Sequence, residues 1–222
     1  MMPIGKWGTP LLELVIRHFM HYGIRKFVVL VGYRGNQIRR YFKDGSRWDI
    51  DIDYSFDNQK LRGTGGALLN AREKITNEHM IISYTDILTS LNFVKFINNH
   101  NANHSIGTLW LDPEWNESLH SVTFDANYNA IHLNSDSKNI LVNTGLSILG
   151  SEVFEILEKY SENKKSIDLS GEIYKLLAEQ EELSGYVSPE WWLDIGSVSR
   201  LTSITRSLLV RRMGHLIEEG VI

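Results

Sequence analysis

The stretch Phe27-Val-Val-Leu-Val31 is a continuous, largely β-branched apolar run between Gly23 and Gly32. A run of this kind, bounded by glycines, is typical of a strand buried on both faces of a sheet. Apolar residues recur at helical spacing before it, over Leu11 to Tyr22, and a short helix is indicated after it, over Gln37 to Phe42. The local order is therefore helix, strand, helix.

The same alternation continues along the chain. Residues Trp48 to Phe56 alternate between apolar and polar side chains, as expected of a half-solvated strand near a sheet edge. A glycine cluster and an Ala/Leu-rich helix ending near Lys74 come next, and Met80 to Ser83 form another apolar strand. Strands that alternate with helices predict an α/β fold with a mostly parallel sheet, whose ligands bind beyond the carboxyl ends of the strands.

From Ser105 onward the expected strands are short and closely spaced. They cover residues 106–111, 120–124, 130–133 and 140–149, and the turn-rich residues 125–129 indicate an antiparallel hairpin. Three helices are expected over residues 151–160, 170–179 and 197–219. Residues 1–222 are expected to form one domain, in which the long last helix completes the core or joins the subunits of a homo-oligomer.

The composition excludes several classes of function. The 222 residues contain no cysteine, which rules out disulfides and cysteine-bound metals and agrees with a reducing compartment such as the cytoplasm. A formal net charge of -4 gives no broad attraction to nucleic acid or to anionic membranes. The run Phe27 to Val31 is far shorter than the roughly 20 apolar residues that cross a bilayer. We expect a cytoplasmic protein with neither nucleic acid nor a membrane as its partner.

Two glycine-containing segments are candidate ligand sites. Three glycines lie within four residues of Leu61-Arg-Gly-Thr-Gly-Gly-Ala-Leu68, where bare backbone allows a flat or anionic ligand to approach. A tight turn in which glycine supplies a positive φ is the alternative. Asn143-Thr-Gly145 interrupts a later strand, and its glycine permits the approach of a ligand or forms a bulge.

Two aspartates are candidate metal ligands. Asp86 follows the strand at residues 80–83 directly, so its carboxylate is expected at the carboxyl edge of the sheet, where Mg²⁺ can bridge it to phosphate. Asp194 lies in Trp191-Trp-Leu-Asp-Ile-Gly196, and an ionised carboxylate among aromatic side chains needs a cation or hydrogen bonds. Either aspartate can instead cap a turn or helix, and for Asp194 the helix starting near Ser197 is the competing interpretation.

Other polar groups give less specific signals. Asp51 and Asp53 form an Asp-x-Asp of the kind that metal-dependent glycosyltransferases use, but their alternating strand favours a solvated face. The eight histidines show no metal-ligand spacing, and no Gly-x-Ser-x-Gly elbow indicates a nucleophilic serine.

Taken in order, these motifs resemble those of the sugar-1-phosphate nucleotidylyltransferases, which make NDP-sugars from an NTP and a sugar 1-phosphate. The matching segments span nearly the whole chain: Met1-Met-Pro-Ile-Gly-Lys6 with Pro10-Leu-Leu-Glu13, Tyr22-Gly-Ile24, Val31-Gly-Tyr-Arg-Gly-Asn-Gln-Ile38, Gly63-Thr-Gly-Gly-Ala67, Thr85-Asp86, Val142-Asn-Thr-Gly145 and Trp192-Leu-Asp-Ile-Gly196. Within the family, the doubled glycine is closer to the heptose and mannose 1-phosphate guanylyltransferase branch than to the thymidylyl enzymes.

The resemblance implies a Rossmann-like three-layer α/β/α fold and a role for each motif. Asp86 and Asp194 would ligate the catalytic Mg²⁺. The loop of Gly63, Thr64, Gly65 and Gly66 would recognise the base through its backbone, and the segment of Asn143, Thr144 and Gly145 would contact the sugar. Transfer of the nucleotidyl group from the NTP to the sugar 1-phosphate would release pyrophosphate.

The sequence also departs from the family pattern. It lacks the family's first strand, its Gly-Gly-x-Gly-Thr-Arg loop and its Pro-Lys-Pro, and Asn134-Ser-Asp-Ser-Lys-Asn139 replaces the usual Glu-Lys-Pro. Lys6 is then the cation expected near the phosphates. Because the loop normally grips the triphosphate, the sequence predicts impaired activity and a sheet with a strand missing from its middle. Two hypotheses follow: an enzyme of NDP-sugar synthesis whose start lies upstream, and an inactive nucleotide- or sugar-binding paralogue that acts as a partner subunit.

Overall fold

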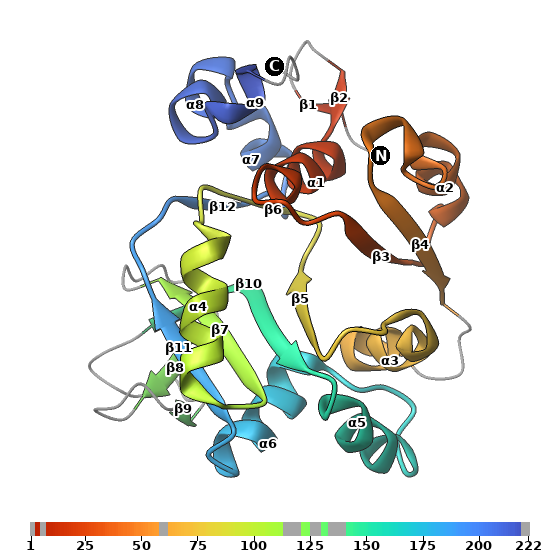
Figure 1. Ribbon diagram of the computed structural model, residues 1–222, viewed down its shortest axis with the longest axis vertical. Helices are drawn as coiled ribbons and strands as arrows, with labels where there is room; N and C mark the ends of the chain where they lie inside the picture. The colour runs from red at the N-terminus through yellow and green to blue at the C-terminus, as the bar shows by residue number, and fades with distance from the viewer. Residues whose placement is uncertain are drawn as a thin grey trace.

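The computed structural model describes residues 3–4, 8–57, 62–112, 121–124, 130–132 and 141–218. Its first half alternates helices and strands in the predicted order (Figure 1). The elements are β1 (Pro3–Ile4), β2 (Thr9–Pro10), α1 (Leu11–His21), β3 (Lys26–Val31), α2 (Gly35–Phe42), η2 (Ser46–Trp48), β4 (Asp51–Phe56), α3 (Gly63–Asn70), η3 (Arg72–Lys74), β5 (His79–Ser83), β6 (Ile87–Thr89) and α4 (Phe93–Asn103).

The second half supplies the remaining strands of the main sheet and the C-terminal helices. The elements are β7 (Gly107–Asp112), β8 (Ser121–Phe124), β9 (Ala130–His132), β10 (Leu141–Gly150), α5 (Val153–Ser161), η4 (Leu169–Ile173), α6 (Tyr174–Glu179), β11 (Leu183–Val187), β12 (Trp192–Asp194), α7 (Val198–Ser203), α8 (Arg206–Arg212) and α9 (His215–Glu218). Strands β8 and β9 form the predicted antiparallel hairpin, whose turn lies outside the described residues.

The main sheet is mixed, with the order β11-β7-β10-β8-β9 and with β5 also paired to β10. Strand β10 is antiparallel to β5, β7 and β8, whereas β11 is parallel to β7. Strands β5, β7, β8 and β11 therefore run in one direction, and β10 runs against them. The predicted α/β fold with a mixed sheet is confirmed, but the expectation that this sheet is mostly parallel is wrong. Most of its hydrogen-bonded pairs are antiparallel because the reversed strand β10 lies among strands of the opposite direction.

Helices cover both faces of this sheet, as the three-layer prediction requires. Trp110 and Leu146 point into a core that includes residues of α1 and α4. Leu109 and Leu111, the neighbours of Trp110 in the strand, point into a second core that includes residues of α5 and α6. Successive side chains of a strand alternate between its faces, so each face acquires its own core.

Strands β3 and β4 form a separate parallel pair. Within the described residues, β3 is hydrogen bonded only to β4 and β5 only to β10, so each keeps one edge without a strand partner. The prediction that residues 27–31 are buried on both faces is wrong, since Leu30 is 37% exposed while Val29 and Val31 are buried. No residue of β5 is fully buried, whereas residues 107–111 of β7 all are. A strand with a neighbour on one edge only is less completely covered by side chains.

The chain after residue 196 differs from the prediction of one long helix over residues 197–219. It forms the three short helices α7, α8 and α9, packed near α1 (Figure 1). Ser197 and Thr205 each leave the helical conformation and cap the helix that follows through their hydroxyl groups. Capping residues end one helix and begin the next, and apolar spacing does not reveal them. No helix of the described residues is long and apolar enough to span a bilayer.

Candidate functional site

Asp86 lies in the turn just before β6, and Asp194 is the last residue of β12, the strand that pairs with β6. Strand β12 pairs with β6 so that Asp194 lies opposite Ile87, and the Ile195 amide donates to the Asp86 carbonyl over 2.8 Å. Asp86 is therefore the residue immediately before Ile87, which is the strand partner of Asp194. The backbones of residues 108 positions apart in the sequence meet because β6, which begins four residues after β5 ends, pairs with β12 in a separate two-stranded sheet.

The Asp194 carboxylate is hydrogen bonded at both oxygens. The Gly196 amide donates to Oδ1 over 2.6 Å, and Arg200 Nη1 donates to Oδ2 over 2.8 Å. The Ser197 hydroxyl accepts from the Arg200 amide and caps α7. Ser197 thus has the helix-capping role that the competing interpretation gave to Asp194, and the charge of Asp194 is balanced by a guanidinium.

The pair is suited to a divalent cation that takes most of its ligands from elsewhere. Among the described residues, no group of three or more His, Asp or Glu side chains could hold a metal by itself. The Asp86 carboxylate has no hydrogen bond or ion pair within that same part of the chain, so its oxygens are available. Mg²⁺ in phosphate-handling sites is usually held by one or two carboxylates, with water and substrate phosphates completing an octahedron. Two aspartates on neighbouring segments of backbone fit that donor set.

The glycine cluster is the first turn of α3 and not a loop before it. Gly63 has φ +82°, and a Cβ there would lie 2.2 Å from the Ile167 carbonyl oxygen. A Cβ on Gly65 would lie 2.7 Å from Ile167 Cγ2, and the Gly65 amide donates to the Ile167 carbonyl. The close approach that these glycines allow is therefore made at least in part by the chain's own backbone. The assignment of Gly63, Thr64, Gly65 and Gly66 to base recognition stays a prediction.

Thr64 fixes this turn to the segment before α6. Its Oγ1 donates to Asp168 Oδ2 over 3.1 Å and accepts from the Leu169 amide over 2.7 Å. Asp168 in turn caps η4 by accepting from the Gly171 amide. The start of α3 and the start of η4 are held as one unit, although they are more than 100 residues apart.

The segment Asn143 to Gly145 forms a bulge in β10, one of the two outcomes that the sequence left open. The register against β7 shifts between Asn143 and Ser147, and Gly145 has φ +86°. Asn143 Oδ1 accepts from the Gly145 amide, and the buried Thr144 hydroxyl donates to the Trp110 carbonyl. The Thr144 hydroxyl is thus engaged inside the sheet. The contact of this segment with a sugar stays a prediction.

Tyr84 links the η4 segment to the Gly145 bulge, and no motif of the sequence singled it out. A Cβ on Gly145 would lie 2.7 Å from Tyr84 Cδ2, and the Tyr84 amide donates to the Gly145 carbonyl. Tyr84 Oη lies 3.4 Å from Ser170 Oγ in η4, and Asp86 is two residues further along the chain. A set of contacts therefore runs from Thr64 through η4 and Tyr84 to the bulge. The one available signal was an aromatic residue between a strand and Thr85-Asp86.

The other predicted residues lie elsewhere. Asp51 and Asp53 are exposed on β4, which pairs only with β3 among the described strands, and Asp53 forms an ion pair with Lys74 at 3.4 Å. The predicted solvated edge strand is confirmed. Lys6, the cation expected near the phosphates, lies outside the described residues.

Comparison with known proteins identifies the class. Residues 1–210 match the family model described as nucleotidyl transferase, which is most of the chain. The chain belongs to the nucleotidyl transferase family.

The chain is also similar to individual proteins, two by sequence and one by structure. The chain is 23% identical over 219 residues to a protein of Bacillus subtilis (strain 168) named as a probable glucose-1-phosphate cytidylyltransferase, covering 90% of this chain and 84% of the relative. It is 27% identical over 207 residues to the D-glycero-α-D-manno-heptose 1-phosphate guanylyltransferase of Aneurinibacillus thermoaerophilus, covering 87% and 86%. The crystal structure of HddC from Yersinia pseudotuberculosis complexed with GMP-PN has the same fold, with TM-score 0.71, 17% identity and coverage of 89% and 84%.

Proposed function

We propose that this protein transfers a nucleotidyl group from an NTP to a sugar 1-phosphate, giving an NDP-sugar and pyrophosphate. The contacts that run from Thr64 through η4 and Tyr84 to Gly145 carry the proposal, and Asp86 follows Tyr84 by two residues. They join the segments expected to bind the base, the sugar and the metal, at the end of the sheet where α/β proteins bind ligands. Relatives named for sugar-1-phosphate substrates support the same reaction.

In this proposal Asp86 and Asp194 hold Mg²⁺, which neutralises charge on the phosphates when it is bound. The chain's own residues orient the two substrates, since phosphoryl transfer depends on alignment of the attacking and leaving oxygens. The α3 start supplies backbone to the base, and the bulge at Gly145 supplies backbone to the sugar. The cytoplasm, where NTPs are made and held, is the proposed place of action.

The test measures pyrophosphate released from each of four NTPs with glucose, mannose and heptose 1-phosphates in the presence of Mg²⁺. We expect release with one pair, and a guanosine nucleotide with heptose or mannose 1-phosphate is the first pair to try. Asp86→Asn and Asp194→Asn are each expected to lower turnover about 100-fold or more, because removal of even an outer-shell partner of a metal site costs 10–100-fold. Asp53→Asn is the matched control, since it removes the same charge from an exposed carboxylate.

The results separate the alternatives. Binding of an NTP or sugar phosphate without any pyrophosphate release would favour the inactive partner subunit. Transfer of sugar from an NDP-sugar, lost in Asp53→Asn, would indicate a glycosyltransferase. Full turnover in both Asp86→Asn and Asp194→Asn would refute the metal assignment.

A further inference from the structure

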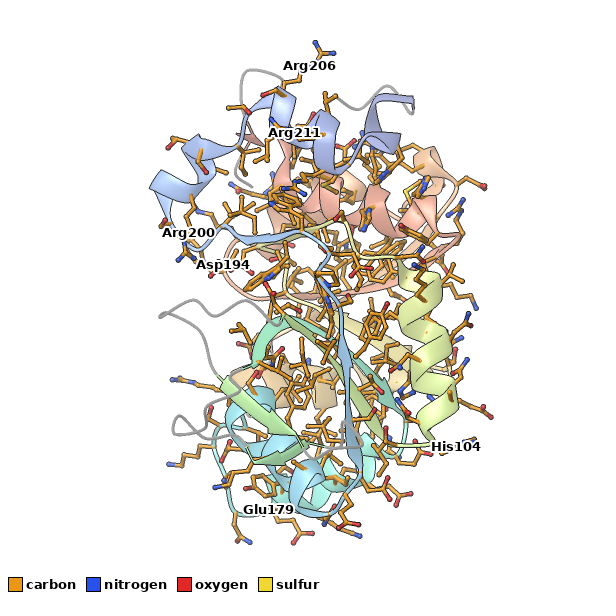
Figure 2. The ribbon with its side chains drawn as sticks, turned by 90° about the vertical axis from the view of Figure 1, so that its left-hand side faces the viewer. His104, Glu179, Asp194, Arg200, Arg206 and Arg211 are labelled. Carbon is orange, nitrogen blue, oxygen red and sulfur yellow. The ribbon has the colours of Figure 1, made fainter. Side chains whose placement is uncertain are left out.

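Asp194 already has a cationic partner within the chain. Figure 2 shows Arg200 beside Asp194 where the C-terminal helices meet the rest of the molecule. The distance from Arg200 Nη1 to Asp194 Oδ2 is 2.8 Å, and the two side chains are 39% and 25% exposed. The Gly196 amide occupies the other carboxylate oxygen at 2.6 Å. The carboxylate that is expected to bind a divalent cation is thus held in place by a guanidinium.

We propose that Arg200 is an internal competitor for the Asp194 carboxylate, which it occupies until a divalent cation binds and turns it away. The inference rests on the proposed function, because that proposal places the cation at Asp86 and Asp194. It adds a regulatory residue to the site, on a helix that carries none of the predicted ligands.

Arg200 and a divalent cation compete for the Asp194 carboxylate because both are positively charged and because Arg200 is held there by a single hydrogen bond. Arg200 reaches Asp194 through one nitrogen and one oxygen, and a hydrogen bond from a guanidinium draws on the negative charge of the carboxylate that would attract a metal ion. A guanidinium and a divalent cation on one carboxylate also repel each other. The effects of two ligands on each other are reciprocal. The free energy by which Arg200 weakens cation binding therefore equals the free energy by which the bound cation weakens the ion pair.

The size of the effect is limited by solvent. Partly exposed ion pairs shift equilibria by about two- to fivefold, so Arg200 is expected to weaken cation binding by that factor and not to block it. A pair of this strength can hold the carboxylate oriented in the absence of metal and still yield to a cation at millimolar concentration.

Release of Arg200 has a structural consequence for α7. Arg200 lies on this helix, which is otherwise attached through Leu201, partly buried against the core, and through the buried Ile204 that follows it. When the ion pair opens, α7 loses a polar attachment while the apolar contacts and the Ser197 cap remain. Cation binding is therefore expected to speed amide hydrogen exchange in residues 200–204.

The test uses Mn²⁺ as the probe and measures its dissociation constant in the full chain by calorimetry or by the paramagnetic resonance signal of free Mn²⁺. The variants are Arg200→Gln, which removes the charge, and Arg200→Lys, which keeps the charge without the planar fork. Arg72→Gln is the matched control, because Arg72 forms an ion pair with Glu158 and has a similar exposure of 44%. Thermal unfolding of each variant checks that it is folded.

We expect Arg200→Gln to bind Mn²⁺ about two- to fivefold more tightly than the natural chain, Arg200→Lys to lie between them, and Arg72→Gln to be unchanged. Exchange at residues 200–204 should quicken with Mn²⁺ in the natural chain and not in Arg200→Gln. Equal affinities in the natural chain and Arg200→Gln would overturn the inference, and if Asp194→Asn then lost the metal the proposed site would stand. Absence of Mn²⁺ binding from every folded variant would overturn both.

Discussion

The ring of Tyr84 packs directly against the backbone of Gly145, at the bulge in the central strand β10. A Cβ on Gly145 would lie 2.7 Å from Tyr84 Cδ2, and the Tyr84 amide donates to the Gly145 carbonyl. Two features require glycine at this position. Its φ of +86° strains any other residue, and the Tyr84 ring occupies the space that a side chain would need. The contact joins the strand that precedes Asp86 to the segment expected to bind the sugar.

Gly145→Ala is expected to lower the free energy of unfolding by about 2–5 kcal/mol, the sum of left-handed strain of roughly 1–2 kcal/mol and overpacking of about 1–3 kcal/mol. Gly23→Ala is the control, since Gly23 has φ +81° with nothing within 4 Å of its Cβ position, so it reports the strain alone. Urea unfolding at pH 7.5 measures both. Equal losses in the two variants would show that Tyr84 can move aside without cost.

Tyr84→Phe and Tyr84→Ala separate the hydroxyl of Tyr84 from its ring. The hydroxyl lies 3.4 Å from Ser170 Oγ, so Phe is expected to change unfolding free energy by less than about 1 kcal/mol. Ala removes the partly buried ring, with an expected loss of about 1–3 kcal/mol because the site is less enclosed than a full core position. Turnover should follow the same order if Tyr84 positions the bulge. A Phe variant as damaged as Ala would mean that the hydroxyl has the larger role.

Thr64→Val removes the link between α3 and η4 while keeping the shape of the side chain. The Leu169 amide would lose its acceptor in a part-buried position, and an unsatisfied group of this kind costs about 1–3 kcal/mol. Thr64→Ser keeps the hydroxyl and should stay within about 0.5 kcal/mol of the natural chain. Denaturant unfolding compares the two. If Val and Ser behave alike, the hydrogen bonds of Thr64 contribute nothing measurable.

A buried histidine cluster between α1 and α9 makes stability depend on pH. His18 Nε2 donates to the Leu91 carbonyl at 3.1 Å, which leaves Nδ1 as the acceptor for His215 Nε2 at 3.2 Å. Burial and the neighbouring His215 lower the pKa of His18 to about 3. Burial and His21 lower the pKa of His215 to about 4. Burial and His79 likewise lower the pKa of His100, which is hydrogen bonded to Thr108, to about 4.

These histidines are neutral in the folded protein but take up protons in the unfolded chain below pH about 6.5. The unfolded state then binds more protons, so stability is fully present above pH 6.5 and falls as the pH drops from 6.5 toward 4. Each of the buried His18 and His100 contributes up to about 1.4 kcal/mol per pH unit in that window. Urea unfolding at pH 7.5, 6 and 5 measures the slope. His18→Gln, which keeps a donor and an acceptor but does not titrate, should reduce it, and an unchanged slope would contradict this assignment.

Much of the fold could be predicted from local patterns. Leu11 to Tyr22 has helical spacing and forms α1, and Met80 to Ser83 has a continuous apolar run and forms most of β5. Asp86 could be placed at a sheet edge because it directly follows that run. The prediction failed at residues 197–219, where the hydroxyl caps of Ser197 and Thr205 break the helix at positions that apolar periodicity does not mark.

The sequence by itself determined the family and the alternation of helices and strands in the first half of the chain, because these depend on short motifs and on spacing within ten or so residues. Only the tertiary structure decided that Ile167 fills the space above Gly63 and Gly65, and that Arg200 pairs with Asp194. The first of these contacts joins residues about 100 positions apart, so no local pattern contains it. The second joins residues only six positions apart, but it depends on the conformation of the non-helical residues 195–197 between them, which apolar spacing does not specify.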